Sequence, residues 1–481
     1  MKADSSLASL LDNRDLITDG DPHYAPILSD LQCNILTGHG KDNAWFFLIQ
    51  FPGGAKSSSK AADIVRALLR HLDFPSELEV REQRRPRPGK TAKTAKSSDD
   101  PVATLLFTAS GYAKLGLSPP SDAAFQAGMA ARAPALNDPS PDGWDASYRG
   151  LDALLLVASD VEDLPRLAQA KGIFQQHGAA FFVERGSTLR AAAGYPIEPF
   201  GFRDGISQPL FYASDLAYKV AQGVLPAAAT WDAAAPLGLA VCPDPNGGTP
   251  FSCGSYFVMR KLRQRVDLFY EQVQAIATAT GRPDEDILAE VMGRRRDGQP
   301  LTRHDGLNGY DYKDDSAGAV CPFHTHARKM NPRSDVPGNY LPRRHRIVRR
   351  AMTYGPSIPR DDTGRPTWPS TVDDDVGLLF LCAQGQLGLQ YEHMQSAWAN
   401  NRMAGGKLVG VDALVGQTSG GETNRIAFHG LDKVTGAPSA EPVRFDWRPV
   451  VETRGGDYFF APSLSFLKTL PTSSGSSSGQ T

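Results

Sequence analysis

The sequence predicts an α+β fold made of two similar halves, each a mainly antiparallel sheet covered by helices. Three observations predict it. Strand-type and helix-type patterns alternate along the chain, their order in the first half is β-α-β followed by β-α-β, and a similar series begins again after a stretch rich in glycine and proline. With 481 residues, of which 41% are hydrophobic, the chain is long enough to bury more than one core.

Short apolar runs and segments with helical spacing of apolar residues mark the elements of the first half. The predicted strands are 45–51, 102–107, 153–157 and 181–184, and the predicted helices are 62–72 and 161–170. This order is the split β-α-β arrangement of a ferredoxin-like unit, in which helices cover one face of the sheet.

The second half repeats this series more loosely. Its predicted strands are 255–259, 377–382 and 457–460, and its predicted helix is 266–278. We place the boundary near residue 215, in the region where the stretch rich in glycine and proline begins. The predicted units are an N-terminal extension (1–30), an N-terminal ferredoxin-like domain (31–215), a C-terminal ferredoxin-like domain (216–470) and a tail (471–481).

Composition and charge exclude several classes of protein. The chain has 51 lysine and arginine residues against 53 acidic ones, which disfavours a nucleic-acid-binding role. No apolar run approaches the ~18 residues of a membrane span, and the N-terminus lacks a signal-peptide pattern, so we expect a cytoplasmic protein. The five cysteines are odd in number and far apart, which predicts reduced, mostly buried thiols.

Three polar stretches are expected to lie outside the packed core. Residues 1–30 are polar and the tail 471–481 has no apolar residue to pack, so both ends are expected to be mobile. The basic, proline-broken segment 81–100 is expected to be neither strand nor stable helix. A solvated insertion loop and a binding site for an anionic partner are both open interpretations of that segment.

The segment 198–209 is shaped by glycine and proline around one carboxylate. Gly201 and Gly205 permit turn conformations and let a flat ligand approach the main chain, so Asp204 is expected to project from a rigid loop. A plain turn is the alternative.

The segment 321–333 carries two histidines, His324 and His326, followed by arginine and lysine. On a helix the two rings would diverge by about 200°, whereas on a strand they would share a face. A neutral histidine is a frequent ligand of metals and of haem iron, while structural histidines are the alternative interpretation.

The segment 343–355 alternates in a way that predicts a strand carrying several arginines. Closely spaced guanidinium groups repel one another, which favours anions such as carboxylates or haem propionates nearby, and a solvated basic edge is the alternative.

These three segments, in this order, resemble those of the dye-decolorizing peroxidases, a family of haem enzymes. Gly201 to Gly205 match the family signature G-x-x-D-G, and Gly-Leu-Leu-Phe-Leu-Cys-Ala-Gln at 377–384 and Gly-Gly-Asp-Tyr-Phe-Phe-Ala-Pro at 455–462 follow as they do in that family. The match runs from about Leu31 to Leu470 and is similar to the larger branch, called class C/D or type V. It implies two ferredoxin-like domains, as in the dimeric α+β barrels, with haem mostly in the C-terminal one.

The resemblance implies roles for the residues around the iron. His326 matches the proximal ligand, with His324 as the alternative, and Asp412 matches the acceptor for its second ring nitrogen. Asp204 matches the distal acid and base, and Arg349 the distal cation, with Arg350 in that place if the register slips. An aspartate stays active as a base in acid, where a histidine would be protonated, so the activity optimum is expected to be acidic.

Four further residues have implied roles. Leu378 and Phe380 resemble the apolar distal wall of the pocket. Arg328, and with it His324, could meet the haem propionates. Tyr354 fits a surface site that relays electrons from bulky dyes, and a packed core tyrosine is the alternative.

The implied function is a haem b peroxidase that reduces hydrogen peroxide through a ferryl intermediate and oxidises aromatic dyes or phenolic reductants. A haem carrier or iron-release protein on the same fold is the second hypothesis, and it would need His326 but not Asp204 or Arg349. A protein without haem, with zinc or no metal at Cys321, His324 and His326, is the third.

Overall fold

An antiparallel sheet of ten strands organises the described part of the chain. The computed structural model describes residues 6–54, 57–84, 101–162, 165–226, 231–302, 306–336, 340–356, 358–361, 375–418, 422–431 and 438–470. In sheet order the strands are β5 Cys242–Pro243, β6 Cys253–Gln264, β14 Val451–Ala461, β2 Val102–Phe107, β3 Ala153–Ser159, β1 Asn43–Gln50, β4 Ala180–Ser187, β8 Met352–Tyr354, β9 Gly377–Gln384 and β7 Val348–Arg349.

Eight of these strands close into a barrel, because β9 pairs with β6 as well as with β8. Each predicted half contributes four consecutive strands to the ring, and the two groups meet where β14 pairs with β2 and where β4 pairs with β8. The predicted α+β class with antiparallel, ferredoxin-like sheets is confirmed. The division of the chain near residue 215 stays a prediction.

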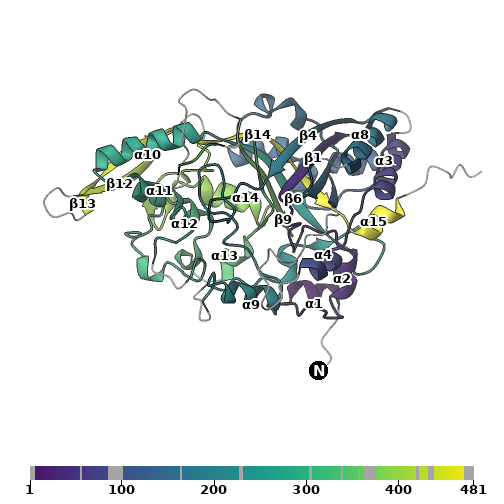
Figure 1. Ribbon diagram of the computed structural model, residues 1–481, viewed down its shortest axis with the longest axis horizontal. Coiled ribbons are helices and arrows are strands. Elements are labelled where there is room, and N and C mark those ends of the chain that lie inside the picture. The colour runs from purple at the N-terminus through teal and green to yellow at the C-terminus, as the bar shows by residue number, and fades with distance from the viewer. Residues whose placement is uncertain are drawn as a thin grey trace, which may run out of the picture.

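The helices surround this barrel. Figure 1 shows α3 and α8 together outside β1 and β4, while α10 and the β12–β13 hairpin extend away from the sheet at the opposite end of the molecule. The hairpin strands are β12 Asn424–Leu431 and β13 Pro438–Trp447, and a smaller pair comprises β10 Met403–Ala404 and β11 Lys407–Leu408. The α-helices are α1 Leu7–Asp12, α2 Ala25–Asp30, α3 Ser57–His71, α4 Glu77–Arg84, α5 Ala109–Leu115, α6 Ala123–Ala127, α7 Met129–Arg132, α8 Pro165–His177, α9 Ala213–Ala221, α10 Val266–Thr280, α11 Asp284–Met292, α12 His326–Met330, α13 Tyr340–Arg344, α14 Tyr391–His393 and α15 Leu464–Thr469.

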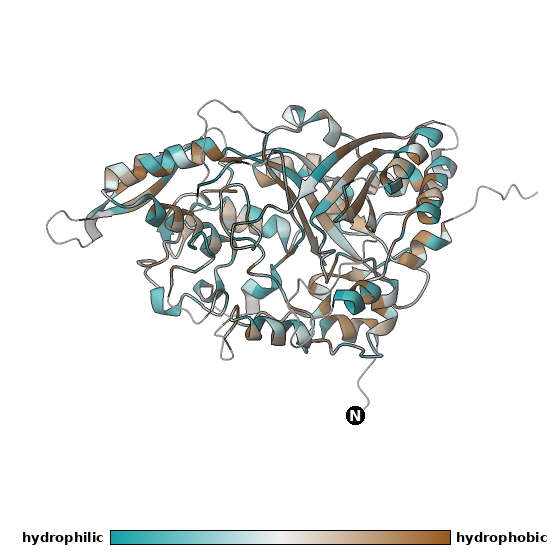
Figure 2. Ribbon diagram, viewed as in Figure 1, coloured by the Kyte–Doolittle hydropathy of each residue, from teal (hydrophilic) through white to brown (hydrophobic). Residues whose placement is uncertain are grey.

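Both faces of the central strands are buried, which explains their continuous apolar sequences. On β1, Phe46 and Leu48 belong to the core inside the barrel, whereas Phe47 and Ile49 pack with α3 and α8 outside it. In Figure 2 the central strands are mostly brown, and α3 and α8 mix teal and brown residues. Successive side chains of a strand point to opposite faces of the sheet, so neighbouring residues of β1 enter different cores.

A third core lies beside the barrel and supports the cavity described below. It joins α10, α11 and the β12–β13 hairpin through residues such as Phe269, Ile287 and Trp447. Phe200 and Phe202 of the segment 198–209 belong to the same core. The chain that carries Asp204 is therefore anchored by buried aromatic rings on both sides of Gly201.

Two expectations about polar segments are wrong. Within residues 6–30, the helices α1 and α2 bury Leu10, Leu11, Ile27 and Leu28 in the core that fills the barrel, so this segment does not lie wholly outside the packed core. Residues 77–84 form the helix α4, which includes the first four residues of the predicted loop 81–100. Residues 1–5, 85–100 and 471–481 lie outside the described residues.

Arg81 shows why α4 differs from the expected solvated loop. Its side chain is buried and its guanidinium contacts Asp19 at 2.8 Å and Asp215 at 2.7 Å. These carboxylates lie far away in sequence, so the local basic pattern could not reveal them. The arginine joins α4 to the N-terminal segment and to α9.

The predicted strand 343–355 is also corrected. Arg343 and Arg344 end the helix α13, and only the short strands β7 and β8 follow. Arg343 pairs with Asp232, and Arg346 donates to the carbonyl oxygens of Ala233 and Ala234 at 3.0 and 2.7 Å. Arg343 and Arg346 thus both contact the loop at residues 232–234. In a continuous strand their side chains, three positions apart, would point to opposite faces of the sheet.

Two findings concern the cysteines and membrane segments. All five cysteines are free thiols; Cys242 is half-buried and the other four are buried. Among the described helices, none combines the length and the apolar character needed to cross a bilayer.

Candidate active site

A cavity at the junction of the barrel and the third core collects most of the predicted site residues. Its walls come from the segment 198–209, from β6, β7 and β9, and from α12 and the turns after α14. Asp204, Arg349, His326, Leu378 and Phe380 line it. These residues are separated by up to 176 positions in sequence, and the fold brings them to one space.

The segment 198–209 is shaped by a half-buried carboxylate that sequence reasoning did not single out. Glu198 accepts hydrogen bonds from the backbone amides of Phe200 and Phe202, both at 2.9 Å, and from Gln264 at 2.6 Å. Burial raises the pKa of Glu198, although these hydrogen bonds act in the opposite direction. Gly201 and Gly205 adopt positive φ values of 97° and 76°, as the sequence suggested for this loop.

Asp204 and Arg349 contact one another on this side of the cavity. Nη1 of Arg349 donates to Oδ1 of Asp204 at 3.1 Å, and the backbone N–H of Gly205 donates to the same oxygen at 2.6 Å. Nη2 of Arg349 donates to the carbonyl oxygen of Ser207 at 3.2 Å. About a third of each charged side chain remains exposed, 33% for Asp204 and 36% for Arg349. A carboxylate and a guanidinium thus face the cavity together and remain accessible to solvent.

Arg350 points away from this cavity. Its guanidinium donates to the carbonyl oxygens of Asn34, Ile35 and Leu36 at 2.8 to 3.1 Å. Burial lowers the pKa of Arg350 to about 10. Of the two adjacent arginines, Arg349 is the one that lines the cavity.

The opposite wall presents His326, the first residue of α12. Thr325 caps this helix, accepting a hydrogen bond from the backbone amide of Arg328 at 3.4 Å. Nδ1 of His326 lies 3.0 and 3.1 Å from the two carboxylate oxygens of Asp412. The cap at Thr325 therefore fixes the start of α12 at His326, and the contact with Asp412 fixes the orientation of the imidazole ring of His326.

The environment of Asp412 determines which nitrogen of His326 carries the proton. Oδ1 of Asp412 also accepts from the backbone amides of Leu414 and Val415, both at 2.9 Å. Burial acts to raise the pKa of Asp412, but the contact with His326 and these amides outweighs it and the pKa lies below its usual value. An ionised carboxylate can only accept, so Nδ1 is the donor and the lone pair of Nε2 remains on the other side of the ring. No described residue is hydrogen-bonded to Nε2.

His324 is not part of this wall. Its ring is buried against Phe428, with centroids 5.1 Å apart, and it precedes the start of α12. Burial lowers the pKa of His324 to about 3, and Lys329 acts in the same direction. The two histidines thus share neither a helix face nor a strand face, and no group of three or more potential metal-binding side chains occurs among the described residues.

Comparison with known proteins identifies the family. The multifunctional dye peroxidase DyP2 of an Amycolatopsis species is 34% identical over 93% of this chain and 96% of its own length. The dye-decolorizing peroxidase msp1 of Mycetinis scorodonius is 27% identical over 92% of this chain and 87% of its own. The solved structure of a DyP-type peroxidase from an Anabaena species has a TM-score of 0.81 and 31% identity, covering 96% of this chain and 99% of that chain. The chain belongs to the dye-decolorizing peroxidase family.

Membership makes the chain an oxidoreductase that uses peroxide, and a haem peroxidase. The solved structure of DyP2 from Amycolatopsis agrees with this, with a TM-score of 0.80 and 31% identity over 94% of this chain and 99% of that one. No protein-family model matches the chain.

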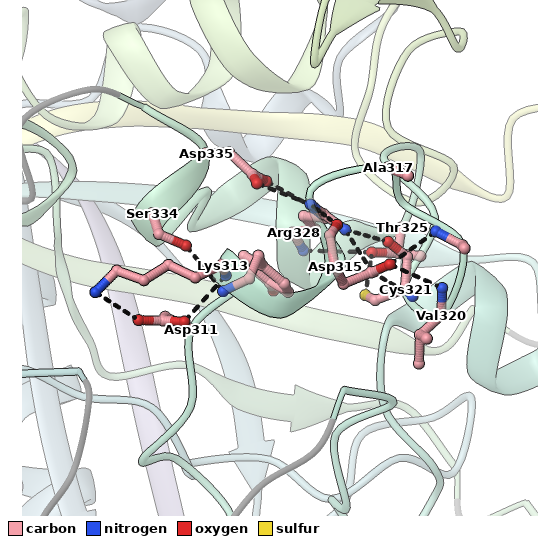
Figure 3. Close-up of polar contacts among 12 residues, drawn as sticks. Asp311, Lys313, Asp315, Ala317, Val320, Cys321, Thr325, Arg328, Ser334 and Asp335 are labelled. Atoms are coloured by element: carbon pink, nitrogen blue, oxygen red, sulfur yellow. Dashed lines mark hydrogen bonds and ion pairs between the residues drawn. The ribbon is translucent and has the colours of Figure 1, made fainter.

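Arg328 of this peroxidase lies behind the cavity wall. Figure 3 shows its guanidinium between Asp315 and Asp335, with Cys321 beside it. It donates to Asp335 at 2.6 and 2.8 Å, to the carboxylate of Asp315 at 2.8 Å and to the carbonyl oxygen of Cys321 at 2.5 Å. Its side chain is 1% exposed and does not line the cavity. The structure thus gives Arg328 carboxylate partners within the protein, and its contact with propionates stays a prediction.

The apolar wall and the predicted relay tyrosine lie on neighbouring strands. Leu378 and Phe380 of β9 line the cavity, and their role as the distal wall stays a prediction. Tyr354 on β8 is only 6% exposed, and its hydroxyl donates to Asp375 at 2.9 Å. Burial raises the pKa of Tyr354, and Asp375 raises it further. The tyrosine therefore lies in the core that fills the barrel rather than on the surface.

Two arginines, Arg333 and the half-buried Arg346, form a cationic end of the cavity that sequence reasoning did not assign. Arg333 is 1% exposed and donates to Asn308 and Tyr310, while its Nε has no hydrogen-bond partner among the described residues. Arg346 donates to backbone carbonyls, and burial lowers its pKa to about 9. Neither forms an ion pair with a carboxylate in the described part of the chain. Only the arginine-rich run 343–350 offered a sequence signal, and it did not distinguish Arg346.

Proposed function

We propose that this chain binds haem b in the cavity and reduces hydrogen peroxide there, with His326 as the iron ligand and Asp204 and Arg349 as the groups that act on peroxide. One observation carries this proposal. The cavity has a histidine with a free Nε2 lone pair on one wall and an ion-paired aspartate and arginine on another. A haem carrier or iron-release protein would need only the first of these features.

The residues present fit the cofactor. A porphyrin is a flat apolar ring with two propionates, and Leu378, Phe380 and Val415 provide apolar lining. Arg333 and Arg346 supply positive charge without a carboxylate partner among the described residues, which suits two carboxylates from a ligand. Nε2 of His326 would bind the haem iron. When bound, haem would supply the redox-active iron at which the peroxide O–O bond is cleaved.

Asp204 and Arg349 divide the remaining work. Asp204 takes a proton from one peroxide oxygen and returns it to the other, which leaves as water. Arg349 stabilises the negative charge that develops as the two oxygens separate. The hydrogen bonds from Gly205 and Arg349 hold the carboxylate of Asp204 in place. Because an aspartate stays ionised in mild acid, we expect an acidic activity optimum.

Asp412 acts through His326. By accepting the Nδ1 proton it fixes the ring orientation and makes Nε2 a stronger donor to iron. Its own charge is maintained by two backbone amides, so this effect does not depend on solvent.

The reducing substrates follow from the family. Relatives are named dye peroxidases, and we propose aromatic dyes or phenolic compounds as electron donors. The haem-carrier hypothesis is less well supported, because it assigns no role to the contact between Asp204 and Arg349.

The test uses purified protein loaded with haem. A Soret band near 400 nm checks the cofactor, and stopped-flow mixing with hydrogen peroxide measures the rate of its spectral change. We expect Asp204→Asn to lower this rate by about 10²- to 10⁴-fold, the contribution of a general base. Asp314→Asn, at an exposed position, is the matched control and should react like wild type. Equal rates for Asp204→Asn and wild type would refute the role of Asp204.

A further inference from the structure

We propose that Gln208 is a positioning residue that holds Arg349 beside Asp204. Its side-chain amide pairs with the backbone of Arg349 as a neighbouring strand would. The inference rests on the proposed function, because it concerns how the two distal groups are kept in place. It assigns a task to a residue that neither the sequence motif nor the comparisons explain.

The strand β7 has an edge without a partner strand among the described residues. This strand is the last in its sheet and pairs on one side with β9, where Arg349 lies opposite Cys382. The backbone amide of Arg350 points toward β9 and donates to Leu381 at 2.6 Å. In an antiparallel pair the N–H and C=O of alternate residues point to opposite edges. Those of Arg349 therefore point away from β9, where no strand follows among the described residues.

Gln208 fills this position with its side-chain amide. Its Oε1 accepts the backbone N–H of Arg349 at 3.1 Å, and its Nε2 donates to the carbonyl oxygen of Arg349 at 3.2 Å. This two-point contact is the one that a neighbouring strand would make. Since a carboxamide has both a donor and an acceptor, glutamine can satisfy both backbone groups at once.

The same short loop makes two further contacts with Arg349. The guanidinium of Arg349 contacts the carboxylate of Asp204 at 3.1 Å and the carbonyl oxygen of Ser207 at 3.2 Å. The loop 204–208 is thus joined to Arg349 through the side chain at one end and through the backbone at the other. Of these contacts, only the one made by Gln208 joins the backbone of Arg349 to the loop that carries Asp204.

The cost of losing this contact follows from its position. Gln208 lines the cavity and is half-buried, so the backbone groups of Arg349 would face the cavity if the amide were removed. The carbonyl oxygen would keep a hydrogen bond from Nη1 of Arg350 at 2.9 Å, but the N–H would lose its acceptor. A displacement of about 1 Å between catalytic groups can cost about 10²-fold in rate.

The first experiment compares Gln208→Met with Gln176→Met in the haem-loaded protein. Methionine has a similar length but can make neither hydrogen bond, and Gln176 is exposed on α8. We expect Gln208→Met to lower the rate of reaction with hydrogen peroxide by about 10- to 100-fold, while KM for the dye is unchanged. Hydrogen–deuterium exchange of the peptide that contains Arg349 should become faster, independently of turnover. Unchanged exchange and an unchanged peroxide rate would overturn the proposal.

A second variant separates positioning from general stability. In Gln208→Glu, the protonated carboxyl can make both contacts, whereas the ionised carboxylate has no proton to donate to the carbonyl oxygen of Arg349. Its peroxide rate relative to wild type should therefore fall as the pH rises through the pKa of the new carboxyl group, which Arg349, Arg350 and Asp204 will influence. A ratio that does not vary with pH would contradict the role of the donor contact.

The double variant with Arg349→Leu distinguishes failure of this inference from failure of the proposed function. If Gln208 acts through Arg349, adding Gln208→Met to Arg349→Leu should lower the peroxide rate by less than about twofold. A full additional loss would show that Gln208 acts elsewhere and would overturn the inference. If Arg349→Leu alone reacts like wild type, the proposed function itself is wrong.

Discussion

The two walls of the cavity are held in different ways. On the His326 side, Asp412 is fully buried and Arg328 is 1% exposed, and both are surrounded by hydrogen-bond partners. On the Asp204 side, the two charged groups are each about one-third exposed and are held by a loop. The first wall is fixed by buried charge pairs, and the second is open to water.

This difference matches the two tasks proposed for the walls. An iron ligand must keep one orientation, and buried, fully satisfied partners provide it. A group that exchanges protons with a small substrate must remain accessible, and partial exposure permits that exchange. We therefore expect changes on the His326 side to alter stability first, and changes on the Asp204 side to alter reactivity first.

Arg328→Met should give the largest effect. Removing this guanidinium leaves the carboxylates of Asp315 and Asp335 buried without their cation, and breaking a buried ion pair in this way costs about 3–5 kcal/mol. Urea denaturation monitored by tryptophan fluorescence would measure the loss of unfolding free energy. Arg425→Met, which removes an exposed pair with Asp446, is the control and should cost about 0–1 kcal/mol.

The same network shows why sequence could not place Arg328. Asp315 and Asp335 lie only 13 and 7 positions from Arg328, but the turns that bring them together are built from contacts that only the fold creates. Arg81 is a similar case, since its partners come from residues 19 and 215. In both cases the sequence around the arginine does not show which carboxylates the fold brings to it. If Arg328→Met were as stable as the control, the buried-pair account of this wall would be wrong.

Other features were accessible from sequence because they are local. Alternation and helical spacing located β1, β2, β3, β6 and α10 within a few residues of their ends. The family motif placed Asp204 and Arg349 at one cavity, although their roles stay predictions. The choice between His324 and His326 was not local, because it depends on the cap at Thr325 and on Asp412, which lies 86 positions after His326.

Asp412→Asn should give the next largest effect. The amide keeps an acceptor for Nδ1 of His326 but loses the negative charge, so the ring becomes a weaker donor to iron. Loss of such a partner typically costs about 10- to 100-fold in activity or metal affinity. Peroxide kinetics and the reduction potential of the haem-loaded protein measure it, and the potential should rise. An unchanged potential would indicate that the charge of Asp412 does not reach the iron.

The pH dependence of this variant sharpens the comparison. The pKa of Asp412 is lower in the folded chain than in the unfolded chain, so the ionised group stabilises the fold above the unfolded pKa of about 3.9. This contribution is lost as the pH falls through the lower folded pKa. The difference in unfolding free energy between wild type and Asp412→Asn should therefore be constant near neutrality and shrink below about pH 4. A difference that grows in acid would contradict the lowered pKa.

Tyr354→Phe should give the smallest effect and decides between the two interpretations of this residue. The hydroxyl contacts Asp375 and the ring is buried, so a packed core tyrosine would lose about 1 kcal/mol of stability and no turnover. A relay residue would instead lose turnover of a bulky anthraquinone dye, while the reaction with peroxide stayed normal. Because the ring is 6% exposed and does not line the cavity, we expect dye turnover to remain within about twofold of wild type. A selective loss of dye turnover would show that electrons from the dye enter the protein through Tyr354 on β8.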